Sequence, residues 1–315
     1  MTAPPTAAAA AWHLALDATA VTTCARLADR GVPAILLKGA GLARRLGTEG
    51  RRVYTDVDLL VAPDTFDRAE RVLTEMGFRS ALPEGRQDPR LVWYERPWRA
   101  PGPVPLVVDL HRAFHGVADP AAFWAVLSGS AQRLPLAGGT VLVPDAGAAA
   151  LLVALHAAAP ARSDRPYADL LRALEVLPVE VWQAAAVLAE RVGAVPLFGF
   201  GLRLAPGGVA LADRLGLPQR STSEQWTRVR RVSGPAHVLA QLAELPTGRD
   251  RLRHLVPHLF PPPAAMRHAS PLARRGPAGL LAAYLWRLAR HVVGLSRVLG
   301  ELRTAARLVR RSGRA

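Results

Sequence analysis

The chain has 315 residues, half of them hydrophobic and 21% charged, so it can bury a sizeable core, and this length favours two domains. Its net charge of +15 would favour a nucleic-acid partner, but arginines occur along the whole chain and aromatic residues make up only 6%. Substrate phosphate and general solubility suffice to explain the charge, and we expect no stable nucleic-acid complex.

The sequence has the pattern of neither a signal peptide nor a membrane span. Residues 1–11 lack a basic start, and the alanine run there follows Pro4 and Pro5. No stretch reaches the roughly 18 uninterrupted apolar residues that a transmembrane helix needs. The one cysteine, Cys24, excludes an internal disulfide framework and a four-cysteine zinc site, and its helical surroundings predict a buried filler. We therefore expect a cytoplasmic protein without a transmembrane segment.

The first part of the chain alternates helical and strand-like patterns. Apolar residues recur at helical spacing over 8–30, and Gly31 ends that pattern. The predicted elements that follow are a buried strand over 32–37, a helix over 40–46, a strand over 54–61 and a helix over 63–76. Residues 81–105 are rich in proline and arginine, which predicts irregular structure with some extended pieces.

The rest of the chain changes from strands to helices. A third apolar run covers 106–110, and Gly138-Gly139 predicts a hairpin with strands over 132–136 and 140–143. After Pro144 helical patterns dominate, over 146–158, 167–177, 181–192, 209–215 and 279–310, with a rigid break at the prolines 261–263. The predicted fold class is α+β: a domain with a mixed sheet and flanking helices over 1–144, followed by an all-helical domain over 145–315.

Three carboxylates stand inside strand-like apolar runs. Side chains alternate across a strand, so Asp56 and Asp58 point to the same face. Two like charges in an apolar strand are costly unless a cation neutralises them, and hard oxygen ligands at close spacing suit Mg²⁺. Asp109 lies in a matching run. If its strand lies beside the second one, three acids converge, which is the geometry that two-metal phosphoryl chemistry uses.

A candidate phosphate site precedes the acids. Gly39 follows a predicted strand and opens a predicted helix, and without a side chain it lets a triphosphate approach backbone N–H groups. Lys38 adds a compact positive charge, and it is the single lysine of an arginine-rich chain. It follows the apolar run 34–37, where an ordinary solvated lysine is not expected. We predict that Lys38 and Gly39 contact the nucleotide.

These motifs resemble the DNA polymerase β-like nucleotidyltransferase superfamily. Its pattern is a strand, a glycine and a helix, then an Asp-x-Asp strand and a later single Asp. Leu-Leu-Lys-Gly-Ala at 36–40, Asp-Val-Asp-Leu-Leu-Val at 56–61 and Asp-Leu-His at 109–111 are similar to the bacterial group usually called uncharacterised nucleotidyltransferases. The specific motifs lie within 1–115, and a weaker likeness in helical features continues to 259–261.

The resemblance implies Mg²⁺-dependent transfer of a nucleotidyl group from a nucleoside triphosphate such as ATP to an acceptor hydroxyl. Asp56 and Asp58 would hold the metals, and Asp109 would complete the catalytic metal site. Lys38 and Gly39 would hold the triphosphate. Ala40 stands where a serine often follows the glycine, so a phosphate-binding hydroxyl is missing from the nucleotide-binding corner.

Other polar residues near these motifs have two interpretations each. Arg51 and Arg52 precede the acids and are candidate phosphate ligands, with ordinary surface charge as the alternative. His111 shares the face of Asp109, where it would touch substrate, orient an acid or make a structural hydrogen bond. We interpret His156 as a satisfied core histidine and Asp169 as a packing or capping residue rather than a metal ligand.

The last helical pattern carries a narrow apolar seam with arginines on the other faces. Its members alternate spacings of four and three: Leu281, Leu285, Leu288, Val292, Leu295, Leu299, Leu302, Ala306 and Val309. Such a seam suits packing against another helix. We expect it to dock on its own domain, and a helix-mediated dimer or an amphipathic helix on a membrane surface are the alternatives.

The sequence leaves the acceptor open: a small molecule such as an antibiotic or a sugar phosphate, a peptide natural product, a protein side chain or an RNA end. The base specificity of the triphosphate is open as well. The alternative function is a non-catalytic regulatory protein that binds a nucleotide or a partner and retains the nucleotidyltransferase fold, against which the three intact acids argue. A third function, an RNA-binding module, has only the basic charge in its support.

Overall fold

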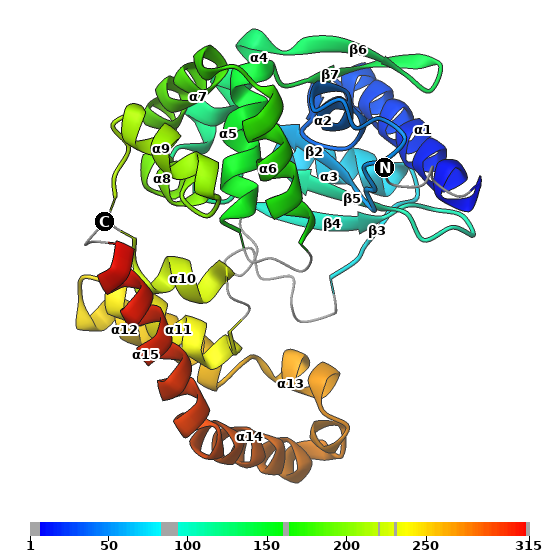
Figure 1. The fold of residues 1–315 in the computed structure, drawn as a ribbon. Helices are drawn as coiled ribbons and strands as arrows, with labels where there is room; N and C mark the ends of the chain where they lie inside the picture. Colours follow the sequence, from blue (N-terminus) through cyan, green and yellow to red (C-terminus); the bar gives the residue numbers. More distant parts are fainter. Residues whose placement is uncertain (1–6, 83–93, 160–163, 220, 230–231, 313–315) are drawn as a thin grey trace.

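The computed structural model of the protein describes residues 7–82, 94–159, 164–219, 221–229 and 232–312. Two parts are evident in Figure 1, an upper part that contains the sheet and a lower part that contains only helices. We call the elements from α1 to α9, which end at Arg214, the body. We call the elements from α10 to α15, which begin at Ser223, the lobe.

A seven-stranded mixed sheet forms the centre of the body. Its strands lie in the order β3-β4-β5-β2-β1-β7-β6. β2 pairs in parallel with β5 and antiparallel with β1, and β1 pairs in parallel with β7. The predicted α+β class is confirmed. The strands are β1 Ala34–Leu36, β2 Val57–Val61, β3 Arg79–Ser80, β4 Glu95–Arg99, β5 Val107–His111, β6 Gln132–Leu136 and β7 Gly139–Val143.

Helices cover both faces of the sheet (Figure 1). α1 Ala7–Asp29 and α3 Phe66–Glu75, which follows the short η1 Pro63–Thr65, share a buried cluster with one face. The other face packs against the remaining helices of the body, with α5 buried at their centre. These are α2 Ala40–Arg45, α4 Pro120–Ser130, α5 Ala146–Ala157, α6 Arg165–Val176, α7 Val179–Arg191, α8 Val195–Leu202 and α9 Pro206–Arg214.

Strand alternation decides which side chains go to which face. Ile35 and Leu60 belong to the cluster around α5, whereas Leu36 and Leu59 belong to the cluster around α1 and α3. Asp58 lies two residues before Leu60, so it shares the face that turns toward α5. Cys24 is buried in α1, as predicted.

The hydrophobic core continues across the predicted domain boundary at Pro144. Ile35 and Phe123, which precede it, belong to one buried cluster with Leu151 and Phe198, which follow it. The change from mixed to purely helical structure does occur there, because α5 and every later described element is helical. Independent folding of 1–144 and 145–315 remains a prediction.

The lobe contains more helices than the sequence patterns predict. No separate helix is predicted between 216 and 278, and the pattern over 279–310 predicts a single long helix. The break at 261–263 lies between α12 and α13, as predicted, and Gly294 divides the long helix in two. The helices are α10 Ser223–Val229, α11 Gly234–Glu244, α12 Gly248–Leu259, α13 Pro263–Ala269, η2 Leu272–Arg274, α14 Gly276–Val293 and α15 Leu295–Ser312.

The division at Gly294 has a local cause and a consequence for the apolar seam. Two β-branched residues precede Gly294, and all three are weak helix formers. α15 packs against α10 and α11 and buries Val298 and Ala305, which are not members of the seam. The seam residues Leu295 and Leu299 of α15 are exposed, as are Leu281 and Val292 of α14. Docking along the whole seam is therefore the wrong expectation.

None of the helices in the described parts of the chain combines the length and the apolar character needed to cross a membrane.

Candidate active site

Asp58 and Asp109 lie opposite each other at the centre of the site. β2 and β5 pair in parallel with Asp58 beside Asp109, and neighbouring strands in a sheet are about 4.8 Å apart. Asp56 immediately precedes β2 and shares their face. All three acids line one cleft with a volume of about 2700 Å³. The strand arrangement on which the predicted convergence depends is present, and the metal-binding role of the acids remains a prediction.

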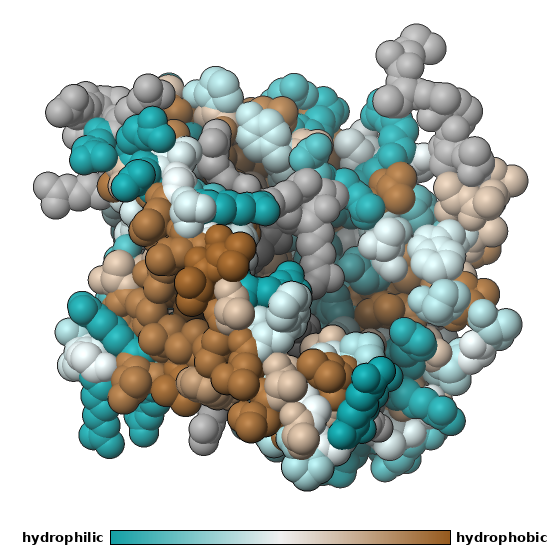
Figure 2. Space-filling view, turned by 90° about the horizontal axis from the view of Figure 1, so that it is seen from below, coloured by the Kyte–Doolittle hydropathy of each residue, from teal (hydrophilic) through white to brown (hydrophobic). Residues whose placement is uncertain are grey.

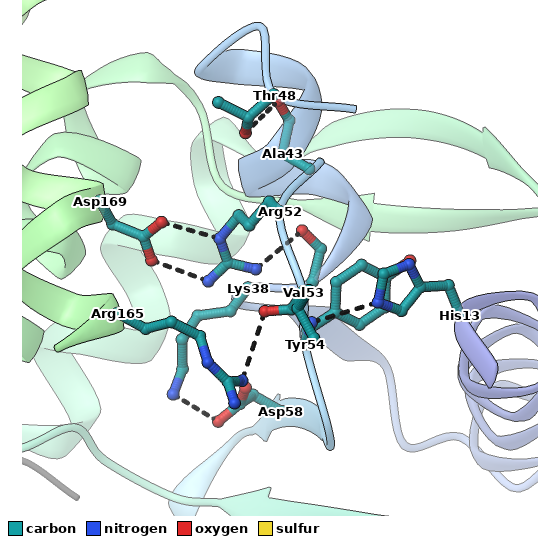
Figure 3. Close-up of polar contacts among 11 residues, drawn as sticks. His13, Lys38, Ala43, Thr48, Arg52, Val53, Tyr54, Asp58, Arg165 and Asp169 are labelled. Atoms are coloured by element: carbon teal, nitrogen blue, oxygen red, sulfur yellow. Dashed lines mark hydrogen bonds and ion pairs between the residues drawn. The ribbon is translucent and has the colours of Figure 1, made fainter. Parts of the chain in front are cut away.

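Asp58 is the most enclosed of the three and has two cationic neighbours. The ammonium of Lys38 lies 2.7 Å from Asp58 Oδ1 (Figure 3). His111, on β5, donates from Nε2 to the same oxygen at 3.1 Å. On the other side of the imidazole ring, Oε2 of Glu95 lies 3.6 Å from His111 Nδ1. His111 therefore lies between two carboxylates on the two strands that flank β5, and its role in orienting an acid remains a prediction.

The pKa values of the acids diverge because the cations are shared unequally. Burial alone would raise the pKa of Asp58, but Lys38 and His111 outweigh it and hold that pKa well below its usual range. Burial, and next the charge of Asp58, raise the pKa of Asp109 to about 7. Burial and then Asp58 also raise the pKa of Asp56. The cationic side chains of the site thus balance the negative charge of Asp58, but not that of Asp56 and Asp109.

Gly39 occupies a conformation that favours glycine. It precedes α2 with a φ of +63°, and a Cβ added there would meet the Tyr54 ring at 3.8 Å. The Tyr54 hydroxyl donates to Asp17 at 2.8 Å, and its ring stacks on His13 with centroids 4.3 Å apart. Through Tyr54, α1 therefore supports the turn at Lys38 and Gly39, which we call the glycine corner. Ala40, the first residue of α2, contributes only backbone polar groups.

Arg52 connects the glycine corner to the helical side of the cleft. Its Nε and Nη2 donate to the two carboxylate oxygens of Asp169 at 3.0 and 2.9 Å, and Nη1 donates to the Gly39 carbonyl at 3.4 Å (Figure 3). Both side chains are largely buried. Asp169 thus holds Arg52 in place through an ion pair, and its interpretation as a packing or capping residue remains a prediction. A direct phosphate contact of Arg52 remains a prediction, whereas Arg51 is exposed and donates to the Gly47 carbonyl at 2.8 Å.

Several residues of the cleft carry no sequence signal that would have identified them. Arg165, at the start of α6, donates to the Val53 carbonyl at 3.3 Å and points toward Asp58 in Figure 3. Its positive charge lowers the pKa of Asp56, although burial and the charge of Asp58 outweigh this effect. From the lobe, Tyr284, Arg287 and His291 of α14 line the same cleft. They are far from the motifs in sequence, so only the tertiary fold brings them there.

His156 lies on α5 at the edge of this site. Burial, and then the charge of Lys38, lower its pKa well below the usual value, so the imidazole is neutral. Its ring lies edge-on to Phe114 with centroids 6.4 Å apart, and the Lys38 ammonium lies 5.6 Å from the Phe114 centroid. His156 is only partly buried and lines the cleft, so its interpretation as a satisfied core histidine remains a prediction.

The donor chemistry of the site fits a hard divalent cation. Three carboxylates face one cleft, and burial and then the charge of Asp58 raise the pKa values of Asp56 and Asp109, which a bound cation would counteract. Among the residues that the structure describes, no three Asp, Glu, His or Cys side chains already surround a single point as metal ligands would. Lys38 supplies the positive charge next to Asp58.

Residues 5–207 match the sequence profile of a family described as uncharacterised nucleotidyltransferase. No curated protein matches the chain in sequence.

Two solved structures show a distant likeness. One is the antibiotic-resistance factor ANT(2'')-Ia, with 21% identity, a TM-score of 0.40 and coverage of 57% of this chain and 96% of that one. The other is an antigenic nucleotidyltransferase-like protein from Paracoccidioides brasiliensis, with 15% identity, a TM-score of 0.35 and coverage of 61% and 95%. With TM-scores this low, neither likeness bears on individual residues.

Proposed function

The chain belongs to the family of uncharacterised nucleotidyltransferases, and we propose that it transfers a nucleotidyl group from a nucleoside triphosphate to an acceptor hydroxyl. The observation that carries the proposal is the in-register pairing of Asp58 with Asp109, with Asp56 on the same face of the same cleft. Three carboxylates in one cleft have little structural use, because like charges repel one another.

Asp56, Asp58 and Asp109 are the residues that would hold Mg²⁺. When bound, the metal would neutralise charge on the triphosphate and orient the reacting groups for in-line attack. The acceptor oxygen forms a bond to the α-phosphorus, the bond between that phosphorus and the bridging oxygen breaks, and pyrophosphate leaves. The proton of the acceptor hydroxyl passes to a carboxylate oxygen of Asp109.

The glycine corner is the proposed place of the triphosphate. Gly39 leaves the backbone accessible, and Lys38, beside it, directs its ammonium into the acid cluster. Arg52 holds the Gly39 carbonyl and so keeps the corner in place. Ala40 brings no hydroxyl, so the proposed phosphate contacts depend on backbone N–H groups and on Lys38. ATP is the triphosphate we would test first.

One observation favours a second candidate function, that of a non-catalytic regulator that binds a nucleotide. The 2.7 Å contact between Lys38 and Asp58 neutralises the central acid without a metal. A protein that had lost catalysis would gain stability from such an ion pair. The two candidates differ in whether pyrophosphate is released.

The test is to incubate the full chain with each α-labelled nucleoside triphosphate, Mg²⁺ and a metabolite extract. We expect a labelled product and pyrophosphate, both lost in Asp58→Asn and Asp109→Asn and retained in Asp64→Asn, whose side chain is exposed on η1. Triphosphate binding without any pyrophosphate would select the regulatory function. If no triphosphate bound at all, both functions would be wrong.

A further inference from the structure

Helix α14 is oriented with its polar side inward and its apolar side outward. Tyr284, Arg287 and His291 recur at helical spacing and line the cleft. The opposite side of the helix faces solvent. We call it the outer α14 face, and its members with their exposed fractions are Leu281 62%, Leu285 59%, Trp286 64%, Val292 72% and Val293 83%.

Hydrogen bonds on the inward side hold this orientation. The Tyr284 hydroxyl donates to the Pro261 carbonyl, and Arg287 Nη2 donates to the His258 carbonyl at 2.8 Å. A rotation that buried the apolar side would break both bonds and expose the small buried cluster to which Ala283 belongs. The outer α14 face is therefore part of the folded state, and it requires a partner, because soluble proteins rarely expose apolar patches of this kind.

The surroundings of the outer α14 face are strongly basic. Residues 248–312 contain thirteen arginines and two acids, Asp250 and Glu301. Arg290, Arg297, Arg303 and Arg307, on α14 and α15, are exposed. Figure 2, which views the molecule from below, shows hydrophobic side chains gathered in one continuous area with hydrophilic side chains along its edges.

We propose that the outer α14 face docks the protein onto the surface of an anionic membrane. Exposed aliphatic side chains and a tryptophan can enter the boundary between headgroups and acyl chains, while flanking arginines contact anionic headgroups. The docking is peripheral, since none of the described helices is long and apolar enough to span a bilayer. The surface lies outside residues 5–207, the part matched by the family.

Charge favours a membrane over the other occupants. A second copy of the chain docked face to face would bring two strongly basic surfaces together, which costs free energy. Nucleic acid would accept the arginines but would leave the five apolar side chains in contact with phosphates and water. An anionic bilayer satisfies the charges and the apolar residues at once.

The test is flotation of the full-length protein with lipid vesicles. One set consists of phosphatidylcholine alone, and the other contains about one third phosphatidylglycerol, which gives the anionic surface. We expect binding to the anionic vesicles only, and weaker binding at high salt, because salt screens the attraction. Arg290→Gln and Arg297→Gln should each weaken binding about fivefold, the effect of one basic residue near an anionic surface.

Two variants test the apolar residues. Val293→Glu and, separately, Trp286→Glu should each weaken vesicle binding by about tenfold or more, because a carboxylate enters an anionic interface. Both side chains are highly exposed and neither lines the cleft, so fold and nucleotide chemistry should be unchanged. Val187→Glu is the matched control, because Val187 on α7 is an apolar residue with 56% exposure elsewhere on the surface.

Several results would overturn the proposal. These are equal binding to neutral and anionic vesicles, no binding to either, and unchanged binding by Val293→Glu and Trp286→Glu. A dimer in solution that Val293→Glu dissociates, without vesicle binding, would identify a second copy as the occupant. RNA binding that is lost in the arginine variants, without vesicle binding, would identify a nucleic acid. None of these results depends on the proposed nucleotidyl transfer.

Discussion

The body and the lobe are stabilised in different ways. The body buries large side chains such as Phe123, Trp182 and Phe198 in a cluster that joins the sheet to its helices. The separate buried cluster of the lobe consists of Met266, Ala273 and Ala283. Many of the larger apolar residues of the lobe face solvent or the cleft.

The charge of the two regions differs as well. Residues 1–222 contain 23 basic and 21 acidic residues, whereas residues 223–315 contain 17 arginines and four acids. The arginines are thus spread along the chain, as the sequence suggested, but the acids that would balance them are absent from its last part. The comparison shows that the body is self-sufficient in core and charge, while the lobe presents unbalanced charge and uncovered apolar surface.

The strongest test of the body as the catalytic region is replacement of its acids. Asp109→Asn should reduce transfer by about a thousandfold, within the range typical of losing a general base. Asp58→Asn should do the same, and it should also lower the free energy of unfolding by about 3 kcal/mol, because Lys38 is left without its buried partner. Pyrophosphate release and chemical denaturation measure the two effects. Normal turnover of either variant would make the acids structural.

The second test compares the cores of the two regions. Leu151→Ala, in the body, should cost about 3 kcal/mol of unfolding free energy, because the side chain is fully buried in the large cluster. Met266→Ala, in the lobe, should cost less, since few apolar atoms surround it. Thermal unfolding followed by calorimetry measures both. An equal loss of unfolding free energy in both variants, with a single unfolding transition, would show that body and lobe form one cooperative unit. The distinction between the two regions would then be wrong.

Lys38 provides a third test, on the size of the cation in the site. Lys38→Arg should lower turnover about tenfold or more, because a planar guanidinium does not fit where a compact ammonium lies 2.7 Å from Asp58 beside Gly39. Arg30→Lys and Arg44→Lys are the controls, since both residues are exposed and outside the cleft. Steady-state turnover and apparent triphosphate affinity are the measurements. An unaffected Lys38→Arg protein would make Lys38 an ordinary charge.

A fourth test is the pH dependence of stability that arises from Asp109. Its folded-state pKa is raised to about 7, so the native state binds a proton between pH 4 and 7 that the unfolded state has released. Without metal, the contribution of this group is full at low pH and is lost as the pH rises through about 7. We therefore expect the melting temperature of Asp109→Asn minus that of the wild type, both measured in the presence of a chelator, to increase between pH 5 and pH 8. A constant difference would contradict the raised pKa.

Much of the fold was predictable because local patterns dominate it. Apolar runs of strand length mark β1, β2 and β5, and Gly138-Gly139 marks the hairpin of β6 and β7. The lobe was less predictable. Its helices are short and rich in proline and arginine, and the division at Gly294 depends on weak helix formers rather than on a proline.

The acids of the candidate site were predictable because they stand in short sequence motifs. The contacts between residues that are remote in sequence were not predictable. Nothing in the spacing of Arg52 and Asp169 indicates that they form a bidentate pair across 117 residues. The pairing of Lys38 with Asp58 likewise depends on β1 and β2 lying side by side. Such contacts join residues that are remote in sequence, and local periodicity carries no information about them.

The sequence by itself identified the three acids and the glycine corner as candidate site residues. It also determined that Asp56 and Asp58 share one face, since side chains alternate along any strand. Only the tertiary structure decided that Asp109 lies opposite Asp58, that α14 lines the cleft, and that the apolar side of α14 faces outward. The physical reason is that the same pattern of apolar residues is compatible with a helix docked on its own domain and with a helix whose apolar side faces outward. Which one forms depends on what the rest of the chain leaves for it to pack against.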